Sequence, residues 1–353
     1  EPAGTETSAA SGSDTTAAGG GETKAVKLQL QWVTQAQFAG YFAAVEEGFY
    51  ADEGLDVSIL EGAVDIVPQQ VVASGGAEFG IAWVPKALVS REEGANLVNI
   101  AQVFQRSGTL EVSWADSGIT EPADWEDKRV GTWGFGNEFE LTAAFELFDV
   151  TPAEVVQQPF DMSLLLNREL DAAQAMTYNE YAQVLEAVNP DTGALYTPDD
   201  LSVINFNDIG TAMLQDAVWV DADWLADNEA LAESFLRASF RGWIFCRDNP
   251  EACVEIVLSR GSALGASHQA WQMNEINALI WPSPEGIGVM DEALWAQTIE
   301  VAVGQSVISA DPGPDAYRSD LAASAVSALE SEGLDTHGAG WEKTTVTLNE
   351  NGE

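Results

Sequence analysis

The chain has 353 residues, of which 46% are hydrophobic, and its 14 basic and 57 acidic residues give a net charge of −43. This length can bury one large core or two lobes, and no apolar run approaches the ~20 residues of a membrane helix. A charge of this sign repels nucleic acid and anionic membranes, so we expect neither as a partner. It indicates a solvated acidic surface suited to solubility, including solubility in high salt, rather than a specific cation site.

Residues 1–23 are mostly small or polar and include no large apolar side chain. This composition is typical of a disordered linker. A mature secreted protein, or a lipoprotein trimmed of its anchor cysteine, would begin in this way. We therefore predict an extracytoplasmic location with a lipid anchor on a removed N-terminal segment. The alternative is a merely disordered terminus.

The first folded segment has the pattern of a strand–helix–strand unit. Apolar and polar residues alternate over 27–32, which predicts a strand, and another strand is expected at 55–59. Between them, the apolar residues Phe38, Tyr41, Phe42 and Val45 recur at helical spacing. Thr34 can cap this helix, and Gly48 can end it in a left-handed conformation. Two strands joined in this way are expected to lie parallel, with a right-handed crossover.

Similar units continue along the chain and predict two α/β lobes that face each other across a cleft. Further strands are expected at 79–83, 97–104, 129–133, 155–158 and 170–176, and helices at 65–74, 85–92, 139–148, 162–167, 177–188, 230–247, 268–279, 291–303 and 316–331. The chain is expected to cross between the lobes near 110–114 and to return over 203–220. The predicted division is therefore 24–112 for the first part of lobe one, 113–212 for lobe two, and 213–353 for the helical remainder of lobe one.

Two cysteines flank a predicted corner between helices. Cys246 and Cys253 lie on either side of Asn249-Pro250, where one helix should end and another begin. A local disulfide at this corner fits a secreted protein, whereas the alternative is two unrelated buried thiols. The sequence holds only two histidines, His268 and His337, so we predict no histidine-rich metal site.

Aromatic and amide side chains gather at the ends of the predicted strands, where α/β proteins place their ligands. Rings can stack on the faces of a flat heterocycle while amides bond its polar edge. The candidate ligand-binding residues are Trp32, Gln35, Gln37, Phe38, Tyr41, Trp83, Phe135, Gly136, Asn137, Glu138, Tyr178 and Asn179. The alternatives are that Phe38 and Tyr41 are core residues of the first helix, that Trp83 plugs the edge of the lobe, and that 134–138 is an ordinary turn.

The glycine-containing turn at 134–138 argues against a phosphate ligand. It lacks Lys and Arg, and Glu138 stands where an anion would bind, so a neutral or amine-bearing ligand fits better. The sequence offers no Ser-His-Asp or Cys-His set that can be assembled, and no HExxH, CxxC or P-loop. We therefore predict a binding protein without a cofactor or a metal, not an enzyme.

Four segments, 37–57, 72–81, 128–131 and 240–243, resemble the periplasmic solute-binding proteins of ABC importers. The resemblance is to the branch that binds thiamine pyrimidine precursors, riboflavin and alkanesulfonates. It implies a type II periplasmic-binding-protein fold, in which each lobe is a mostly parallel sheet flanked by helices and two segments cross between the lobes. It also implies a monomer that encloses a flat nitrogen heterocycle by hinge closure and passes it to a membrane permease and its ATPase.

The same branch includes a pyrimidine synthase of thiamine biosynthesis, which uses a lysine for pyridoxal phosphate and an active-site histidine. The first turn here, 34–37, contains neither residue type, which favours the receptor over the enzyme. Sulfonate binders would be expected to offer more cationic donors than Lys86 alone. A ligand-sensing domain without transport remains an alternative to the importer receptor.

Overall fold

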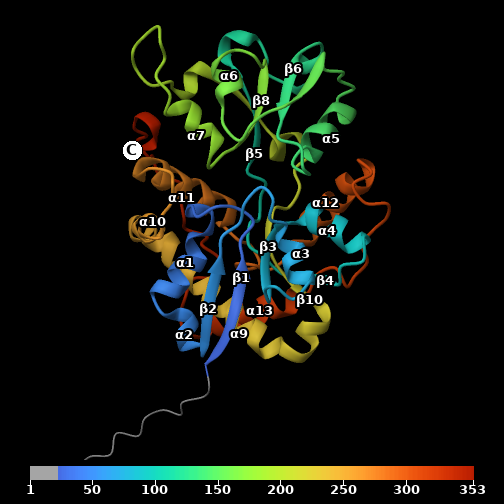
Figure 1. Cartoon of the computed structure of the whole chain (residues 1–353), viewed down its shortest axis with the longest axis vertical. Helices are drawn as coiled ribbons and strands as arrows, with labels where there is room; N and C mark the ends of the chain where they lie inside the picture. Colours follow the sequence, from blue (N-terminus) through green and yellow to red (C-terminus); the bar gives the residue numbers. More distant parts are fainter. Residues whose placement is uncertain (1–22) are drawn as a thin grey trace, which may run out of the picture.

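Two five-stranded sheets form the centres of two lobes in the computed structural model, which describes residues 23–353 (Figure 1). The linker predicted for 1–23 lies outside the described residues, except for Thr23. Helices flank both sheets, and the second lobe lies above the first in this view. The predicted two-lobed α/β fold is therefore confirmed.

The sheet of the first lobe has the order β2-β1-β3-β10-β4. Its strands are β1 (Lys24–Gln29), β2 (Leu55–Leu60), β3 (Phe79–Trp83), β4 (Leu97–Gln102) and β10 (Asp216–Asp221). β1 pairs in parallel with β2 and β3, whereas β10 runs antiparallel between β3 and β4.

The second sheet repeats this plan with the order β7-β6-β8-β5-β9. Its strands are β5 (Thr109–Trp114), β6 (Arg129–Thr132), β7 (Glu154–Gln157), β8 (Ala172–Met176) and β9 (Leu201–Asn205). β6 pairs in parallel with β7 and β8, whereas β5 is antiparallel to β8 and β9. In each sheet the one reversed strand, β5 or β10, is the first strand after the chain has entered that lobe.

The strand pairing indicates where the chain crosses from one lobe to the other. The predicted boundary at residue 112 falls inside β5, which pairs only with strands of the second sheet. We therefore propose that the first crossing is the segment 103–108, which precedes β5. The return crossing would be 210–215, between the short helix at 206–209 and β10, close to the predicted boundary at residue 212.

The helices of the first lobe cover both faces of its sheet. They are α1 (Ala39–Glu46), α2 (Phe49–Asp52), α3 (Pro68–Ala73), α4 (Val84–Glu92), α9 (Ala222–Asp248), α10 (Pro250–Ser259), α11 (Ala266–Ile280), α12 (Glu292–Gly304) and α13 (Ser319–Ser331). Alternate residues of β10 show the two faces: Val218 and Val220 pack with α1, α9 and α13, whereas Ala217 and Trp219 pack with α4 and α12.

The helices of the second lobe are shorter. They are α5 (Phe139–Leu147), α6 (Ser163–Leu166), α7 (Glu180–Leu185) and α8 (Phe206–Ile209). Leu110 and Val112 of β5 pack with α6 and α7 on one face of the sheet. The opposite face packs against α5, in a cluster that contains Trp125 and Phe206.

The first strand–helix turn differs in detail from the prediction. β1 ends at Gln29 because its partner β2 ends at Leu60, so Trp32 lies in the loop beyond the sheet. Thr34 does not cap a helix; a short 3-10 turn, Ala36–Phe38, precedes α1 instead. Gly48 follows the helix with φ +79°, as predicted.

Gly40 and Gly242 lie in two of the segments that resemble solute-binding proteins, 37–57 and 240–243, and they meet in the first lobe. A Cβ atom on Gly242 of α9 would lie 1.9 Å from the Gly40 carbonyl oxygen of α1, and the indole ring of Trp243 covers Gly40. The helices can therefore pack this closely only because both positions lack a side chain. This contact fixes α1, and with it the turn that carries Trp32, on the lobe.

Cys246 of α9 and Cys253 of α10 form a disulfide at the corner between the two helices. Across residues 23–353, no helix combines the length and apolar character that a membrane span requires.

Candidate functional site

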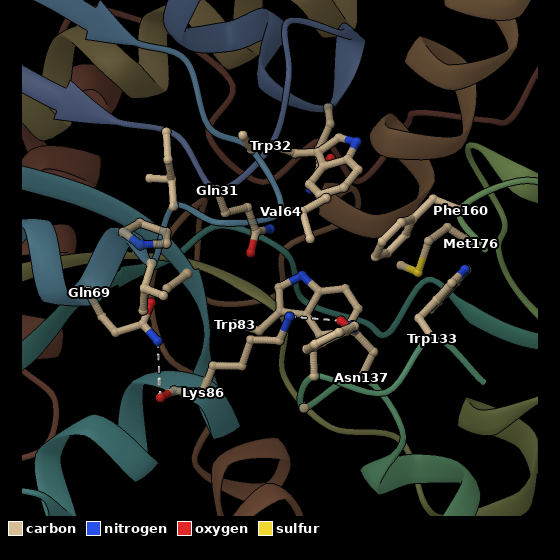
Figure 2. Close-up of a pocket in the computed structure, with 18 of the residues that line it drawn as sticks. Gln31, Trp32, Val64, Gln69, Trp83, Lys86, Trp133, Asn137, Phe160 and Met176 are labelled. Carbon is tan, nitrogen blue, oxygen red and sulfur yellow. Dashed lines mark hydrogen bonds between the residues drawn. The ribbon is translucent and has the colours of Figure 1, made fainter. Parts of the chain in front are cut away.

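A cavity of about 490 Å³ lies between the two lobes (Figure 2). Trp32 and Trp83 line it from the first lobe, and Trp133, Phe160 and Tyr178 line it from the second. Trp32 and Phe160 meet across the cleft with ring centroids 5.0 Å apart. A molecule held in this cavity would therefore contact both lobes at once.

Nine of the twelve predicted ligand-binding residues line the cavity. They are Trp32, Gln35, Gln37, Trp83, Phe135, Gly136, Asn137, Tyr178 and Asn179. The tertiary structure thus brings together four segments that are separated by up to about 150 residues in the sequence. That these residues bind a ligand remains a prediction.

Phe38, Tyr41 and Glu138 were expected in the site, but none of them lines the cavity. Phe38 and Tyr41 are buried in the core of the first lobe, where Tyr41 packs edge-on against Trp243 at 5.5 Å. Their helical spacing reflects packing in the core, which was the alternative considered for them. The Glu138 carboxylate turns back and accepts a hydrogen bond from the Gly136 backbone N–H at 2.9 Å.

A buried carboxylate organises the first-lobe wall. Asp216, at the start of β10, accepts hydrogen bonds from Gln31 Nε2 at 2.5 Å and from Trp83 Nε1 at 2.9 Å through Oδ1. Its Oδ2 accepts from Gln37 Nε2 at 3.0 Å. Burial raises the pKa of Asp216 to about 7, and these three donors oppose that shift. Asp216 thus fixes the orientation of two amides and one indole at the cavity wall.

Gln37 also accepts a hydrogen bond from Gln35, whose Nε2 donates to Gln37 Oε1 at 2.7 Å. Gln35 is almost wholly buried, and its Oε1 has no partner within residues 23–353. Gln35 and Gln37 therefore form a fixed chain of amides that runs from the cavity wall to Asp216.

Lys86 reaches from α4 across the cleft. Its Nζ donates a hydrogen bond to Asn137 Oδ1 in the second lobe at 2.8 Å, as Figure 2 shows, and it lies 4.9 Å from the centre of the Trp83 ring. Burial lowers the pKa of Lys86 to about 8, although the carboxylates of Glu138 and Asp216 oppose that shift. Lys86 is the only Lys or Arg that lines the cavity in the described part of the chain.

The turn after β6 forms part of the second-lobe wall in an unusual conformation. Phe135 has φ +57° and stands between Gly134 at +70° and Gly136 at +84°. A left-handed conformation at a bulky residue costs about 1–3 kcal/mol, a strain that is typical of ligand-binding loops. The result is a phenyl ring that is 68% exposed at the cavity.

A second buried network lies behind Asn179 and connects the lobes. Asn179 Nδ2 donates to Glu180 Oε1 at 2.7 Å, and Asn179 Oδ1 faces His268 Nε2 of α11 at 3.0 Å. The other ring nitrogen of His268 faces Glu186 Oε1 at 2.8 Å. Burial raises the pKa of Glu180, which lines the cavity, to about 7.

Several residues of the site escaped the sequence analysis. Asp216 lies in a segment expected only to cross between lobes, and its partner Gln31 is 185 residues away. Phe160 lies in a loop without a distinctive pattern. Lys86 was named only as the single cationic donor in the argument against a sulfonate ligand and not as a candidate binding residue, although it lies three residues after Trp83. Among residues 23–353, no group of three or more His, Cys, Asp or Glu side chains is arranged to hold a metal ion.

Comparison with known proteins adds to this geometry. Residues 35–253, more than half of the chain, match the family described as NMT1/THI5 like. The chain belongs to the NMT1/THI5-like family. The matched range contains all the cavity-lining residues except Gln31 and Trp32, and it also contains Asp216.

Named relatives of this NMT1/THI5-like chain fall into two kinds. It is 24% identical over 328 residues to the riboflavin-binding protein RibY of Chloroflexus aurantiacus, covering 88% of this chain and 89% of RibY. It is 24% identical to the formylaminopyrimidine-binding protein of Halalkalibacterium halodurans, covering 67% and 70%. It is also 24% identical to a 4-amino-5-hydroxymethyl-2-methylpyrimidine phosphate synthase of Legionella pneumophila, covering 66% and 72%.

Solved structures share the fold of this NMT1/THI5-like chain. The periplasmic sulfonate-binding protein SsuA of Methylobacillus flagellatus superposes with a TM-score of 0.63 at 15% identity, covering 93% of this chain and 99% of that one. The fold is therefore that of a periplasmic binding protein, as the sequence resemblance implied.

Proposed function

We propose that this protein is an extracytoplasmic solute receptor of an ABC import system that captures a flat nitrogen heterocycle between its lobes. The observation that carries the proposal is the cavity itself, where indole and phenyl faces from both lobes surround fixed amides. Aromatic faces and amide edges suit a pyrimidine or a flavin-like ring system. Relatives that are named for binding riboflavin and a formylaminopyrimidine support this ligand class.

Hinge closure follows from the same geometry. The Lys86–Asn137 hydrogen bond and the Trp32–Phe160 contact join the lobes only when they are close together. A ligand that contacts both walls binds the closed form better than the open one, and this difference in affinity drives closure. The closed form would then be the one recognised by a permease and its ATPase.

Binding can be tested on protein that has been freed of carried-over ligand by unfolding and refolding. We expect saturable binding of riboflavin or of 4-amino-5-hydroxymethyl-2-methylpyrimidine, measured by titration calorimetry and tryptophan fluorescence. Trp83→Phe should weaken binding because it removes the Nε1 donor to Asp216 and narrows the stacking face. Trp341→Phe is the matched control, since Trp341 does not line the cavity.

The absence of saturable binding for either compound, together with no small molecule that copurifies and is detected by mass spectrometry, would contradict the receptor proposal. A ligand-sensing domain would bind in the same way. Uptake that depends on a permease and an ATPase encoded beside the gene distinguishes import from sensing.

The synthase relative makes an enzyme the second candidate, and Lys86 is the observation that favours it. A buried lysine with a pKa of about 8 is suited to form a Schiff base with pyridoxal phosphate. The remaining residues do not fit that cofactor, because no other Lys or Arg in the described cavity wall could face its phosphate. The Gly136 N–H is already bonded to Glu138, and Asp216 and Glu180 add carboxyl groups nearby.

Absorbance spectroscopy separates the two candidates. After incubation of the protein with pyridoxal phosphate, we expect the absorbance spectrum of the free cofactor. A shift of that spectrum that disappears when Lys86 is replaced would favour the enzyme.

A further inference from the structure

The cavity changes in character from its buried end to its open end. Gln35, Gln37 and Trp83 are buried beside Asp216 at the inner end. Four other lining residues, Val64, Val67, Phe135 and Phe160, are large, apolar and exposed by 58%, 45%, 68% and 37%, respectively. We call these four residues the apolar rim. Because they both line the cavity and face solvent, they lie where the cavity opens.

Both lobes contribute to the apolar rim. Val64 and Val67 lie in the loop between β2 and α3, and this loop is tied to the Trp32 segment because Gly62 N donates to Trp32 O at 2.9 Å. Phe160 lies between Trp32 of the first lobe and Trp133 of the second, with ring centroids 5.0 and 6.4 Å away. Figure 2 shows Val64 and Phe160 on the side of the cavity opposite Lys86 and Asn137.

A ligand made of one pyrimidine ring would leave the apolar rim in water. The inner amides could bond the polar edge of such a ligand. The ligand is, however, too small to fill the cavity of about 490 Å³ and also cover the apolar rim. Exposed apolar side chains that line one cavity from both lobes indicate a surface that is covered in use. The strained backbone at Phe135 is a second sign, because it holds a phenyl ring at the opening instead of in the lobe.

We propose that the apolar rim is an outer subsite that holds the apolar ring of a fused-ring ligand whose polar, nitrogen-rich edge faces the inner amides. This rests on the proposed receptor function and specifies its ligand class. The ligand is bound with its polar end inward and its apolar end at the opening. The rim discriminates ligands that carry an apolar fused ring from those that lack it, because only that ring buries Val64 and Val67.

Two compounds that differ only in this apolar ring provide the test. Lumazine is a bicyclic pteridinedione, and lumichrome carries the same two rings fused to a dimethylbenzene ring. The ligand-free full chain should bind lumichrome at least about 10-fold more tightly than lumazine, measured by fluorescence titration, since burying the extra ring removes apolar area from water. 4-Amino-5-hydroxymethyl-2-methylpyrimidine serves as the single-ring probe and should bind no more tightly than lumazine.

The variant Val64→Ala/Val67→Ala should reduce the preference for lumichrome over lumazine to within about threefold, while the affinity for lumazine changes by less than about twofold. Val303→Ala is the matched control: Val303 is also an exposed valine of the first lobe, in α12, but it does not line the cavity, so the preference should persist.

Equal affinity of the wild type for lumichrome and lumazine, or an unchanged preference in the double variant, would overturn the outer subsite and leave the receptor proposal standing. The subsite is also overturned if the double variant binds both compounds normally but loses uptake through the importer, because the rim would then be a permease contact. Failure of all the heterocycles to bind would instead contradict the proposed function.

Discussion

At the scale of single residues, Asp216 has the widest influence on the candidate site. It is an acidic side chain in a protein with 57 Asp and Glu residues, yet it is buried and accepts hydrogen bonds from three cavity-lining side chains. A buried acceptor with three donors can be replaced only at the cost of leaving some donors unpaired. Asp216 is therefore a positioning residue, which acts on a ligand through Gln31, Gln37 and Trp83.

Asp216→Asn tests this role. The asparagine NH₂ group would face an N–H donor of either Gln37 or the Gln31–Trp83 pair, so at least one hydrogen bond is lost, at about 1–3 kcal/mol. We expect ligand affinity to fall about 10-fold or more by calorimetry, with the folded state retained by circular dichroism. Asp56→Asn, on the exposed face of β2, is the control and should bind normally. Wild-type affinity in Asp216→Asn would refute the positioning role.

At the scale of elements, α11 links the two halves of the site. It packs in the first lobe, but successive side chains reach in different directions. Gln269 Oε1 accepts from Ala36 N in the turn before α1 at 2.7 Å, whereas Trp271 Nε1 donates to Thr177 O in the second lobe at 2.9 Å. His268 contacts Glu186 and Asn179 of the second lobe. We infer that α11 holds the lobes in the closed arrangement.

His268→Ala should favour the open arrangement, because it removes both interlobe contacts and leaves the buried Glu186 carboxylate without its partner. We expect about a 10-fold loss of ligand affinity and a larger radius of gyration by small-angle X-ray scattering in the presence of ligand. His337→Ala is the matched control, since the other histidine pairs with Glu330 at the surface and does not contact the second lobe. A compact, tightly binding His268→Ala protein would show that α11 plays no such role.

At the scale of the whole molecule, the net charge of −43 dominates. Like charges on a compact surface repel each other, and salt reduces this repulsion as the screening length falls from about 10 Å at 0.1 M to about 3 Å at 1 M. Most of the 14 Lys and Arg residues take part in ion pairs, as Arg237 does with Glu53, and they are far fewer than the 57 acidic residues. Most carboxylates therefore depend on counterions.

Raising NaCl from 0.1 to 1 M should therefore increase the midpoint temperature of unfolding, measured by scanning calorimetry at fixed pH. The same osmolality of sucrose serves as the control, because it stabilises by exclusion without screening charge. If the midpoint temperature rises equally in NaCl and in sucrose, or does not rise in NaCl, charge repulsion does not limit the stability of this protein.

The buried carboxyls give the stability a defined pH dependence. Burial raises the pKa of Glu140, Glu180 and Asp216 to about 7, and that of Glu111 well above its usual range. The folded chain then binds more protons than the unfolded chain between about pH 4 and 7, so the free energy of unfolding falls as pH rises through this window. The buried carboxyls make their full contribution to the free energy of unfolding below the pKa values that they have in the unfolded chain. At still lower pH, carboxylates whose pKa is lowered by folding, such as Asp320, oppose this contribution.

We expect a larger free energy of unfolding at pH 5.5 than at pH 8, from urea denaturation in 1 M NaCl, where surface repulsion is screened. Glu140→Gln should reduce the difference, because the amide stays uncharged at both pH values, whereas Glu47→Gln at an exposed position should leave it unchanged. A free energy of unfolding at pH 8 that equals or exceeds the value at pH 5.5 would contradict the predicted effect of the buried carboxyls.

Local patterns predicted most of the architecture of this protein, but β5, β9 and β10 lie in segments that were expected only to cross between the lobes. The strand β1 and the helix α1, which ends just before Gly48, follow from alternation, helical spacing and glycine, which act over a few residues. The segments that resemble solute-binding proteins belong to the same strand ends that line the cavity, so most of its aromatic and amide residues could be named in advance.

Tertiary structure alone decided which of those side chains face the cavity. Helical spacing is the same whether a ring packs on a core or on a ligand, so only the contact with Trp243 shows that Tyr41 belongs to the core. The pairing of Gln31 with Asp216, the reach of Lys86 to Asn137, and the link from Asn179 to His268 join residues 51 to 185 positions apart. Such contacts depend on how two lobes close on each other, and local sequence carries no record of that geometry.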